Sequence, residues 1–342
     1  MRGGHRRALR RLAIYPLVAI LLIVVGNAAY ASSNVSVSPI APLSRESGHL
    51  ARVPAAPLAA KPAPPVMTIL APSAFDQLRS DLEAIARASG GRVGISLEEL
   101  SGPRRTNLSI NGGQSFGAAS TYKLVLLMAE AQQIASGQGR DSDLLCYAAS
   151  DAEDGWFMDY QPGSCYTRGE LARRTGRYSD NTAAHILVRY LGGPEALNRY
   201  AKSIGMNRSA LWVPNTTTPD DLSQAFVSEA LGQLGGAAAQ GWLYPILTHT
   251  ATEQGVPAGL PAGSTVVHKT GTMTGTENDA AYVRNGRIAY VLSVTVDGLD
   301  EGTAWSLVAR VSARIWQYES NRPDFAPLVT VRPAATPSQN RH

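Results

Sequence analysis

Apolar residues near the start of the patterned part of the chain recur every three or four positions and stop at the glycine pair Gly90-Gly91. They are Phe75, Leu78, Leu82 and Ile85. This spacing predicts an amphipathic helix that ends at the glycines. Two β-rich runs follow at 92–97 and 106–110, and Gly102-Pro103 marks a turn between them. The patterned region therefore opens with one helix and two strands.

The closing part of the chain begins with strands and ends with a helix. Its β-rich runs are 265–272, 278–284 and 287–296, and its helical run is 302–318. Asn285-Gly286, between the last two runs, is a strong hairpin signal. Residues 120–254 have a helical pattern interrupted by glycines. Because strands at both ends flank a helical insertion, we predict an α+β fold with an antiparallel sheet built from N- and C-terminal strands plus a large all-helical subdomain.

Residues 1–31 have the layout of a secretory signal, with a basic start, an apolar run and small residues before a cleavage point. The apolar run is shorter than the roughly 20 residues of a spanning helix. This favours a cleaved signal peptide, with an uncleaved signal anchor, and so a membrane tether, as the alternative. The exported chain would then comprise a Pro- and Ala-rich linker at 32–72, a folded domain at 73–320 and a disordered tail at 321–342. We expect a secreted or extracytoplasmic protein.

Charge and cysteine content exclude several classes of protein. The net charge is +4, but the basic residues gather in the signal and scatter elsewhere, which argues against a nucleic-acid partner. The sequence has neither a His-x-x-x-His nor a Cys-x-x-Cys pattern, so we expect no metal and no cofactor. The two cysteines, Cys146 and Cys165, are predicted to form a disulfide, because pairing is usual in exported proteins.

A serine and a lysine stand three residues apart at the start of an apolar run, 124–134. In a helix this spacing places Ser120 and Lys123 on one face. A serine hydroxyl is a poor nucleophile until a base removes its proton, and a buried amine at a helix start can be neutral enough to act as that base. The pair therefore predicts a nucleophile and its general base.

Two further stretches follow in order: Ser179-Asp180-Asn181, and Lys269-Thr270-Gly271-Thr272 on a predicted strand. Hydroxyls, an amide and a cation are the groups that acyl transfer to an anionic substrate requires. Ser-x-x-Lys, Ser-Asp-Asn and Lys-Thr-Gly in this order resemble the signature of class A β-lactamases and penicillin-binding proteins, an active-site-serine hydrolase family. The resemblance covers about 75–318 and implies a monomeric serine hydrolase that opens a cyclic amide.

The resemblance also implies a role for each matching residue. The catalytic residues would be Ser120, Lys123, Ser179 and Lys269. Ser120 would be acylated, Lys123 would accept its proton, and Ser179 would pass a proton to the leaving nitrogen. The substrate-binding residues would be Asn181, Thr270, Gly271 and Thr272. Asn181 would bind the substrate's side-chain amide, and Lys269, Thr270 and Thr272 would hold the substrate carboxylate. The backbone N–H groups of Ser120 and Thr272 would form the oxyanion hole.

The sequence departs from the family at one point. Class A β-lactamases use a loop glutamate to hydrolyse the acyl-enzyme, but here no glutamate lies between Glu195 and Glu229. Lys123 or Asp221 could serve as an alternative base, although Asp221 is expected at a helix start. The sequence therefore predicts a β-lactamase-family hydrolase with slow turnover. The alternatives are a penicillin-binding-type D-alanyl-D-alanine peptidase or β-lactam sensor that acts on cell-wall peptide or is trapped by β-lactams, and an idle wall-binding module.

Histidines are predicted to have structural roles. His185 and His249 lie in helical runs, where packing or surface positions are usual. His268 neighbours Lys269 on a strand, so its side chain is expected on the opposite face.

Overall fold

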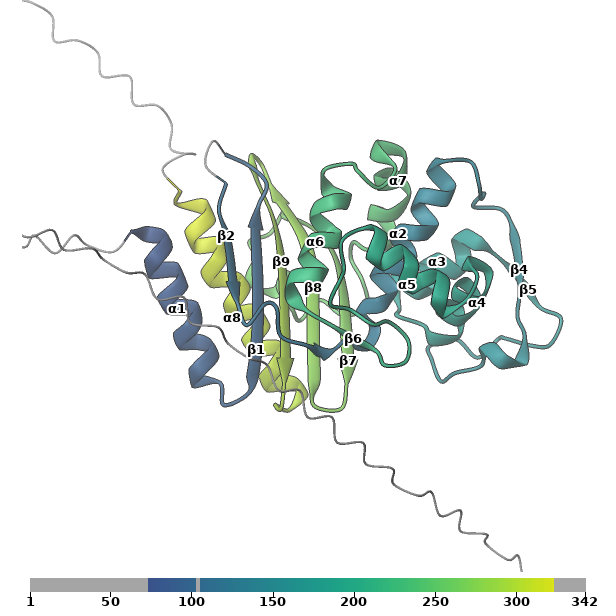
Figure 1. The fold of residues 1–342 in the computed structure, drawn as a ribbon, viewed down its shortest axis with the longest axis horizontal. Coiled ribbons are helices and arrows are strands. Elements are labelled where there is room, and N and C mark those ends of the chain that lie inside the picture. The colour runs from purple at the N-terminus through teal and green to yellow at the C-terminus, as the bar shows by residue number, and fades with distance from the viewer. Residues whose placement is uncertain (1–72, 103–104, 323–342) are drawn as a thin grey trace, which may run out of the picture. The chain divides into compact units, whose positions relative to one another are not determined.

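A five-stranded sheet joins the two ends of the patterned region in the computed structural model, which describes residues 73–102 and 105–322. The strand order is β2-β1-β9-β8-β7, and all neighbouring strands are antiparallel (Figure 1). The strands are β1 (Arg92–Glu99), β2 (Asn107–Ile110), β7 (Thr265–Met273), β8 (Thr276–Asn285) and β9 (Ile288–Asp297). Since β1 pairs with β9, the first and last segments share one sheet, as predicted.

Helices cover both faces of this sheet (Figure 1). The α-helices of the described residues are α1 (Ala74–Ala88), α2 (Tyr122–Ala135), α3 (Arg168–Arg177), α4 (Asn181–Leu191), α5 (Pro194–Ser203), α6 (Pro219–Ala230), α7 (Gly236–Leu243) and α8 (Glu301–Ser320), of which α1, α6 and α8 cover the sheet. Helices α1 and α8 pack on one face with Val93, Ile95 and other apolar strand residues. Helix α6 packs on the other face, where Gly94 leaves no room for a side chain beside Pro219. Successive side chains of β1 point to opposite faces of the sheet, so one set contacts α1 and α8 and the other faces α6.

Helix α2 lies at the centre of the helical part. Every residue from Tyr122 to Ala131 is buried, including Lys123 and Glu130. Its apolar side chains join a core formed with α3, α4, α5, α6 and α7. The predicted buried helix after Ser120 is confirmed, and its burial explains why a lysine at position 123 lies away from water.

The helical part also contains two short strand pairs. Strand β4 (Leu144–Cys146) pairs with β5 (Cys165–Thr167), and β3 (Phe116–Gly117) pairs with β6 (Thr216–Thr217). Cys146 and Cys165 are cross-strand partners and form the predicted disulfide. This disulfide-linked hairpin restrains the segment between α2 and α3, and part of that segment forms one wall of the site described below.

The hairpin predicted at Asn285-Gly286 joins β8 to β9. Asn285 pairs with Ile288, so the loop consists of Gly286 and Arg287. Gly286 has a φ of 56°. A glycine with positive φ at the first loop position is typical of a type II′ turn.

The folded region extends slightly beyond its predicted end. Arg322, which was assigned to the tail, is buried and forms ion pairs with Glu99 and Glu319. The predicted signal and linker, and the tail from 323 onward, lie outside the described residues. Within the described part of the chain, no helix combines the length and apolar character needed to cross a membrane.

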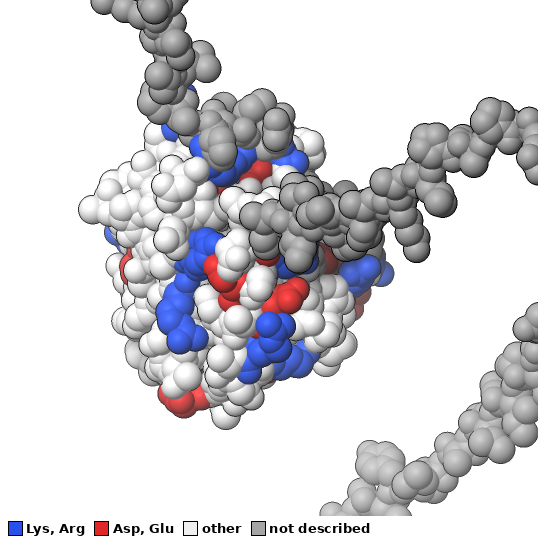
Figure 2. Space-filling model, turned by 90° about the vertical axis from the view of Figure 1, so that its left-hand side faces the viewer, with Lys and Arg blue, Asp and Glu red and all other residues white. Residues whose placement is uncertain are grey.

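Charges of both signs are interspersed on the face formed by α1, α8 and β2 (Figure 2). Several of them pair: Arg314 with Asp81 at 2.8 Å, and Arg87 with Glu83 at 3.4 Å. Such exposed pairs contribute little to stability. Because positive and negative side chains lie next to each other, this view shows no large patch of a single charge.

Candidate active site

Ser120 lies on a single 3₁₀ turn, η1 (Ala119–Thr121), which leads into α2. Ala119 has a φ of 46°, a conformation that non-glycine residues seldom adopt. Two asparagines from distant elements hold this turn. Asn215 Nδ2 donates to Ala119 O at 2.9 Å, and Asn278 Nδ2 donates to the preceding Gly117 O at 2.8 Å. The surrounding structure therefore fixes the position of Ser120.

Gly271 allows β7 to approach this turn. A Cβ atom at Gly271 would lie 2.8 Å from Ala118 O and 3.0 Å from Thr121 N. Any side chain would push the Ser120 turn away from the strand. The sequence assigned Gly271 to substrate binding, which stays a prediction; in the structure, the protein's own backbone makes the close approach to Gly271.

Lys123 is fully buried one turn after Ser120. Its Nζ lies 3.1 Å from Ser120 Oγ and 3.4 Å from Ser179 Oγ, and it also donates to the backbone oxygen of Ser179 and to Asn181 Oδ1. Burial lowers the pKa of Lys123 to about 8, although the carboxylates of Asp180 and Glu153 oppose this change. A substantial neutral fraction near neutral pH is what a proton acceptor requires.

Ser179 connects the two buried lysines. Lys269 Nζ donates to Ser179 Oγ at 2.9 Å and to Thr270 O at 2.7 Å. Burial and the charge of Lys123 together lower the pKa of Lys269 well below its ordinary value. Ser179 itself has a φ of 59°, the second non-glycine residue of the site in the left-handed region. Hydrogen bonds thus link Ser120, Lys123, Ser179 and Lys269 without a break.

Asp180 positions the opposite wall of the site. It caps α4, and its Oδ2 accepts from the backbone N–H of Trp156 at 2.9 Å. Its Oδ1 accepts from the Tyr160 hydroxyl at 2.7 Å. Asn181 Nδ2 donates to Asp154 O at 2.7 Å. These bonds fasten the segment around 153–157 to the start of α4.

Two cavities meet at Ser120. One, of about 420 Å³, is lined by Ala119, Ser120, Tyr122, Glu153, Asn181, His185, Trp212, Val213, Asn215, Thr272 and Met273. The other, of about 660 Å³, is lined by Ser120, Asp154, Gly155, Trp156, Tyr178, Ser179, Asn181, Thr252, Thr270 and Thr272. The predicted site residues Ser120, Asn181 and Thr272 border both cavities. Thus one continuous groove runs past the nucleophile predicted from the sequence.

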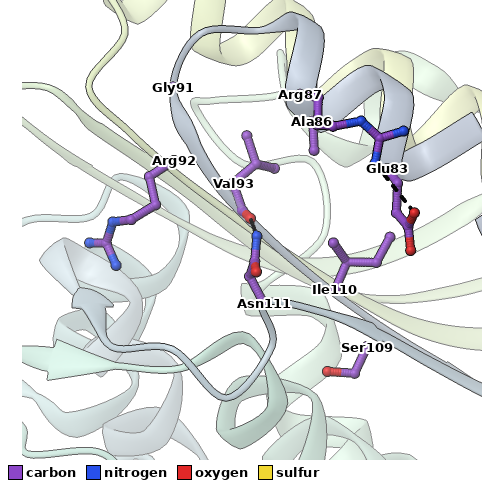
Figure 3. A pocket seen from close by; sticks show the side chains of 9 residues that line it. All are labelled: Glu83, Ala86, Arg87, Gly91, Arg92, Val93, Ser109, Ile110 and Asn111. Carbon is purple, nitrogen blue, oxygen red and sulfur yellow. Dashed lines mark hydrogen bonds and ion pairs between the residues drawn. The ribbon is translucent and has the colours of Figure 1, made fainter.

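A third cavity, of about 670 Å³, lies between α1 and β2 (Figure 3). Its wall includes Arg87, which pairs with Glu83, and Asn111, which donates to Val93 O. It contains none of the motif residues, so its size alone does not make it a candidate active site.

Glu153 and His185 form a pair in the smaller cavity that the sequence did not predict. His185 Nε2 lies 2.7 Å from Glu153 Oε2, and the Trp212 ring packs on the imidazole with centroids 4.5 Å apart. Burial lowers the pKa of His185, although Glu153 opposes this change. His185 follows Asn181 by four residues on α4, a spacing that places both on one helical face. This four-residue spacing was the feature of the sequence that could have placed His185 in the site.

The loop between α5 and α6 brings Trp212, Val213 and Asn215 to the cavity, and no acidic residue of this loop lines it. The next acids, Asp220 and Asp221, are in the first turn of α6. Asp221 accepts from Ser209 Oγ at 2.7 Å and from Arg208 N at 2.9 Å, and Asp220 accepts from Ser109 Oγ at 2.9 Å. Both are thus engaged away from the cavity, which weighs against Asp221 as the deacylating base.

His268 lies behind Lys269 on the other face of β7, as alternation predicted, but it has more than a packing role. It is fully buried, with Nδ1 3.0 Å from Asp279 Oδ1 and Nε2 3.1 Å from Glu253 Oε1. Burial opposes a charge here, yet the two carboxylates outweigh it and raise the pKa of His268 to about 9. The imidazolium and the two acids form an ion triad that supports the strand carrying Lys269.

This triad should make stability depend on pH. The pKa of His268 is about 9 when folded, against about 6.5 when unfolded. The stabilisation is therefore fully present below pH 6.5 and is lost as pH rises through about 9, a loss on the order of 3 kcal/mol. Urea unfolding of the wild type at pH 6 and pH 9.5 should show this loss, and His268→Gln should show much less. Equal pH dependence of the two proteins would contradict the assignment.

Within the described residues, no group of three His, Cys, Asp or Glu side chains is placed to hold a metal ion.

Comparisons with known proteins agree with this fold. A family model described as the Beta-lactamase enzyme family matches residues 77–319. The chain is 30% identical over 242 residues to the β-lactamase CTX-M-25 of Escherichia coli, covering 64% of this chain and 80% of the relative. It is 30% identical over 229 residues to the β-lactamase OXY-2 of Klebsiella oxytoca, covering 61% and 77%.

Among solved structures, PBP-A aligns with a TM-score of 0.66 and 27% identity, covering 70% of this chain and 95% of that one. A mutant of PBP-A, described as an acyl-enzyme complex with penicillin G, aligns with a TM-score of 0.67 and 27% identity, covering 71% and 96%. The three motifs, the α+β fold and the family model agree, and the chain belongs to the β-lactamase enzyme family, together with the class A serine β-lactamases and penicillin-recognising proteins.

Proposed function

We propose that residues 73–320 form an exported serine hydrolase that β-lactams acylate on Ser120 and that releases the acyl group slowly. The observation that carries the proposal is the unbroken hydrogen-bond chain from Ser120 through Lys123 and Ser179 to Lys269. A wall-binding module has no need for two buried lysines, because burying each ammonium costs free energy without a chemical use. The predicted signal at 1–31 supports export.

In the proposed acylation, Ser120 Oγ attacks the β-lactam carbonyl carbon while its proton moves to Lys123 Nζ. The backbone N–H groups of Ser120 and Thr272 stabilise the oxyanion. When the tetrahedral intermediate collapses, the C–N bond breaks and Ser179 gives its proton to the nitrogen. Ser179 regains a proton from the lysines beside it, 3.4 Å away at Lys123 and 2.9 Å away at Lys269. Asn181 would bind the substrate's side-chain amide.

The proposed slow release follows from the loop between α5 and α6, which presents Trp212 and Val213 to the cavity and carries no acid that could act as the family's loop glutamate does. A positioned general base contributes about 10²–10⁴-fold to rate. Glu153 is a carboxylate on the opposite wall of the same cavity, but it is paired with His185. We therefore expect hydrolysis of the acyl-enzyme, and not its formation, to limit turnover.

A second candidate function is that of a penicillin-binding-type D-alanyl-D-alanine peptidase, or a sensor, whose natural acyl donor is a cell-wall peptide. Two features together favour it: the hydrogen-bonded residues proposed for acylation are all present, and the loop between α5 and α6 has no acidic residue. The similarity to PBP-A over 95% of that protein's length supports it as well.

Pre-steady-state kinetics with a chromogenic cephalosporin test the proposal. We expect a burst of product equal to the enzyme concentration, followed by a slow phase that is about 10²–10⁴-fold slower than the turnover of an ordinary class A enzyme. Glu153→Gln is an informative companion variant: a further decrease confined to the slow phase would identify Glu153 as the residual base. Fast linear turnover without a burst would contradict slow release, and no product at all would contradict the proposed function.

A further inference from the structure

One hydroxyl assigned to substrate recognition already has a partner within the protein. Thr272 and Glu277 are cross-strand neighbours on β7 and β8, and Thr272 Oγ1 donates to Glu277 Oε2 at 2.7 Å. Thr272 borders both cavities at Ser120. Glu277 lies behind it with only 3% of its surface exposed. A buried carboxylate therefore occupies the hydroxyl that the family resemblance assigns to the substrate's carboxylate.

The chemistry of a hydroxyl makes this contact consequential. Thr272 has one O–H to donate, and its remaining capacity is to accept hydrogen bonds. When the proton points toward Glu277, the oxygen presents only lone pairs to the groove. A substrate carboxylate, which can only accept, would face lone pairs backed by a negative charge. An uncharged group with an N–H would find a suitable acceptor.

The surroundings of Glu277 reinforce this electrostatic character. Glu301, at the start of α8, is a second acid whose charge acts on Glu277. Asp279 comes two residues later on β8, and so on the same face, but it is engaged by His268 and by the backbone N–H of Val256. Lys269, the cation of the motif, donates to Ser179 Oγ and Thr270 O. The acids near this end of the groove thus favour a neutral ligand group.

We propose that Glu277 is a specificity-determining residue that biases this end of the groove against a substrate carboxylate and toward a neutral N–H donor such as a carboxamide. The proposal rests on the proposed function for the identity of the groove. The preferred acyl donors are then amides or lactams in which the position next to the scissile bond bears an amidated carboxylate. Carboxylate-bearing β-lactams are accepted less well than the two lysines alone would allow.

Protonation of Glu277 should relieve the bias. Burial raises the pKa of Glu277 to about 7, although the bond from Thr272 opposes this change, and Glu301 raises it further. Below this pH the protonated carboxyl can donate to Thr272 Oγ1 and free its hydroxyl for a substrate carboxylate. Discrimination against carboxylates should therefore appear as pH rises through about 7. Lys123 acts on both kinds of substrate, so the ratio of their rates removes its contribution. Lys269, whose pKa is also lowered, is present in the wild type and in Glu277→Gln alike, so comparing the two proteins removes its contribution.

The test compares benzylpenicillin with its carboxamide, measured as second-order acylation rates at pH 6 and pH 8.5. For the wild type, the rate ratio of carboxylate to carboxamide should fall between these pH values. Glu277→Gln should raise the ratio at pH 8.5 by about tenfold, as expected for a hydrogen bond to a charged group, and should weaken the fall of the ratio between pH 6 and pH 8.5. Glu301→Gln, which removes an acid without touching Thr272, is the matched control and should change the ratio by less than about twofold.

Binding of both ligands to Ser120→Ala and to Ser120→Ala/Glu277→Gln, measured by calorimetry, gives a readout that needs no chemistry. If Glu277→Gln changes the ratio of the affinities for the carboxylate and the carboxamide, the result supports the inference, whether or not an adduct forms. The absence of an adduct would contradict only the proposed function. The inference is overturned if adducts form and Glu277→Gln changes the acylation rates of both substrates equally. It is also overturned if the ratio of affinities does not change. In both cases the proposed function still holds.

Discussion

Replacing Ser120 with alanine is expected to abolish covalent labelling of the protein by a fluorescent penicillin. Ser120 Oγ lies 3.1 Å from the buried amine of Lys123, whereas Ser179 Oγ lies between the two lysines, where it is placed to relay a proton. Removal of the nucleophile should leave no detectable acyl-enzyme. Gel fluorescence after denaturation measures the covalent adduct alone.

The matched control for this variant is Ser109→Ala. Ser109 Oγ binds Asp220 at the start of α6, so its loss also removes a serine hydroxyl but leaves the groove intact. This control should label as the wild type does. Labelling that survives in Ser120→Ala, with a melting temperature close to that of the wild type, would refute the assignment of the nucleophile.

Lys123→Ala is expected to slow acylation by about 10²–10⁴-fold, the usual contribution of a positioned base. The wild type should also show a characteristic pH profile. Because Lys123 accepts a proton only when neutral, and its pKa is about 8, the acylation rate should rise with pH and level off above about 8. Measuring the profile on Glu277→Gln as well as on the wild type separates the titration of Lys123 from that of Glu277.

Lys202→Ala provides the control for this second variant. Lys202 is exposed in the last turn of α5, and its replacement should leave the rate and the profile unchanged. A profile that is flat between pH 6 and pH 9 in the wild type, or a Lys123→Ala protein that acylates at the wild-type rate, would exclude Lys123 as the base.

Features that depend on neighbouring residues were predictable from the sequence. The spacing of Ser120 and Lys123 already specifies a shared helical face, and the apolar run after them specifies burial and with it a weakly basic amine. The hairpin signal at Asn285-Gly286 and the strands at both ends specify the antiparallel sheet. The order of the three motifs then indicates which residues meet, although it gives no distances.

Features that depend on contacts between distant segments were not predictable. Glu153 lies in an irregular segment, and only the folded chain brings it to His185 on α4. The bond between Thr272 and Glu277 depends on the register of β7 and β8, which a change of one residue in the intervening turn would shift. The charged partners of His268 likewise come from separate elements. Patterns of residues along the sequence do not show which distant segments contact one another.

The central claim is that Ser120 forms an acyl-enzyme that decays slowly, and intact-mass spectrometry of the full chain with benzylpenicillin tests it most directly. Free penicillin is removed after a brief incubation, and the mass is followed over time with peptide mapping of the adduct. We predict one adduct per chain, located on the peptide that contains Ser120, which persists long after acylation is complete. Consumption of penicillin without an observable adduct, or an adduct on any other residue, would contradict the account.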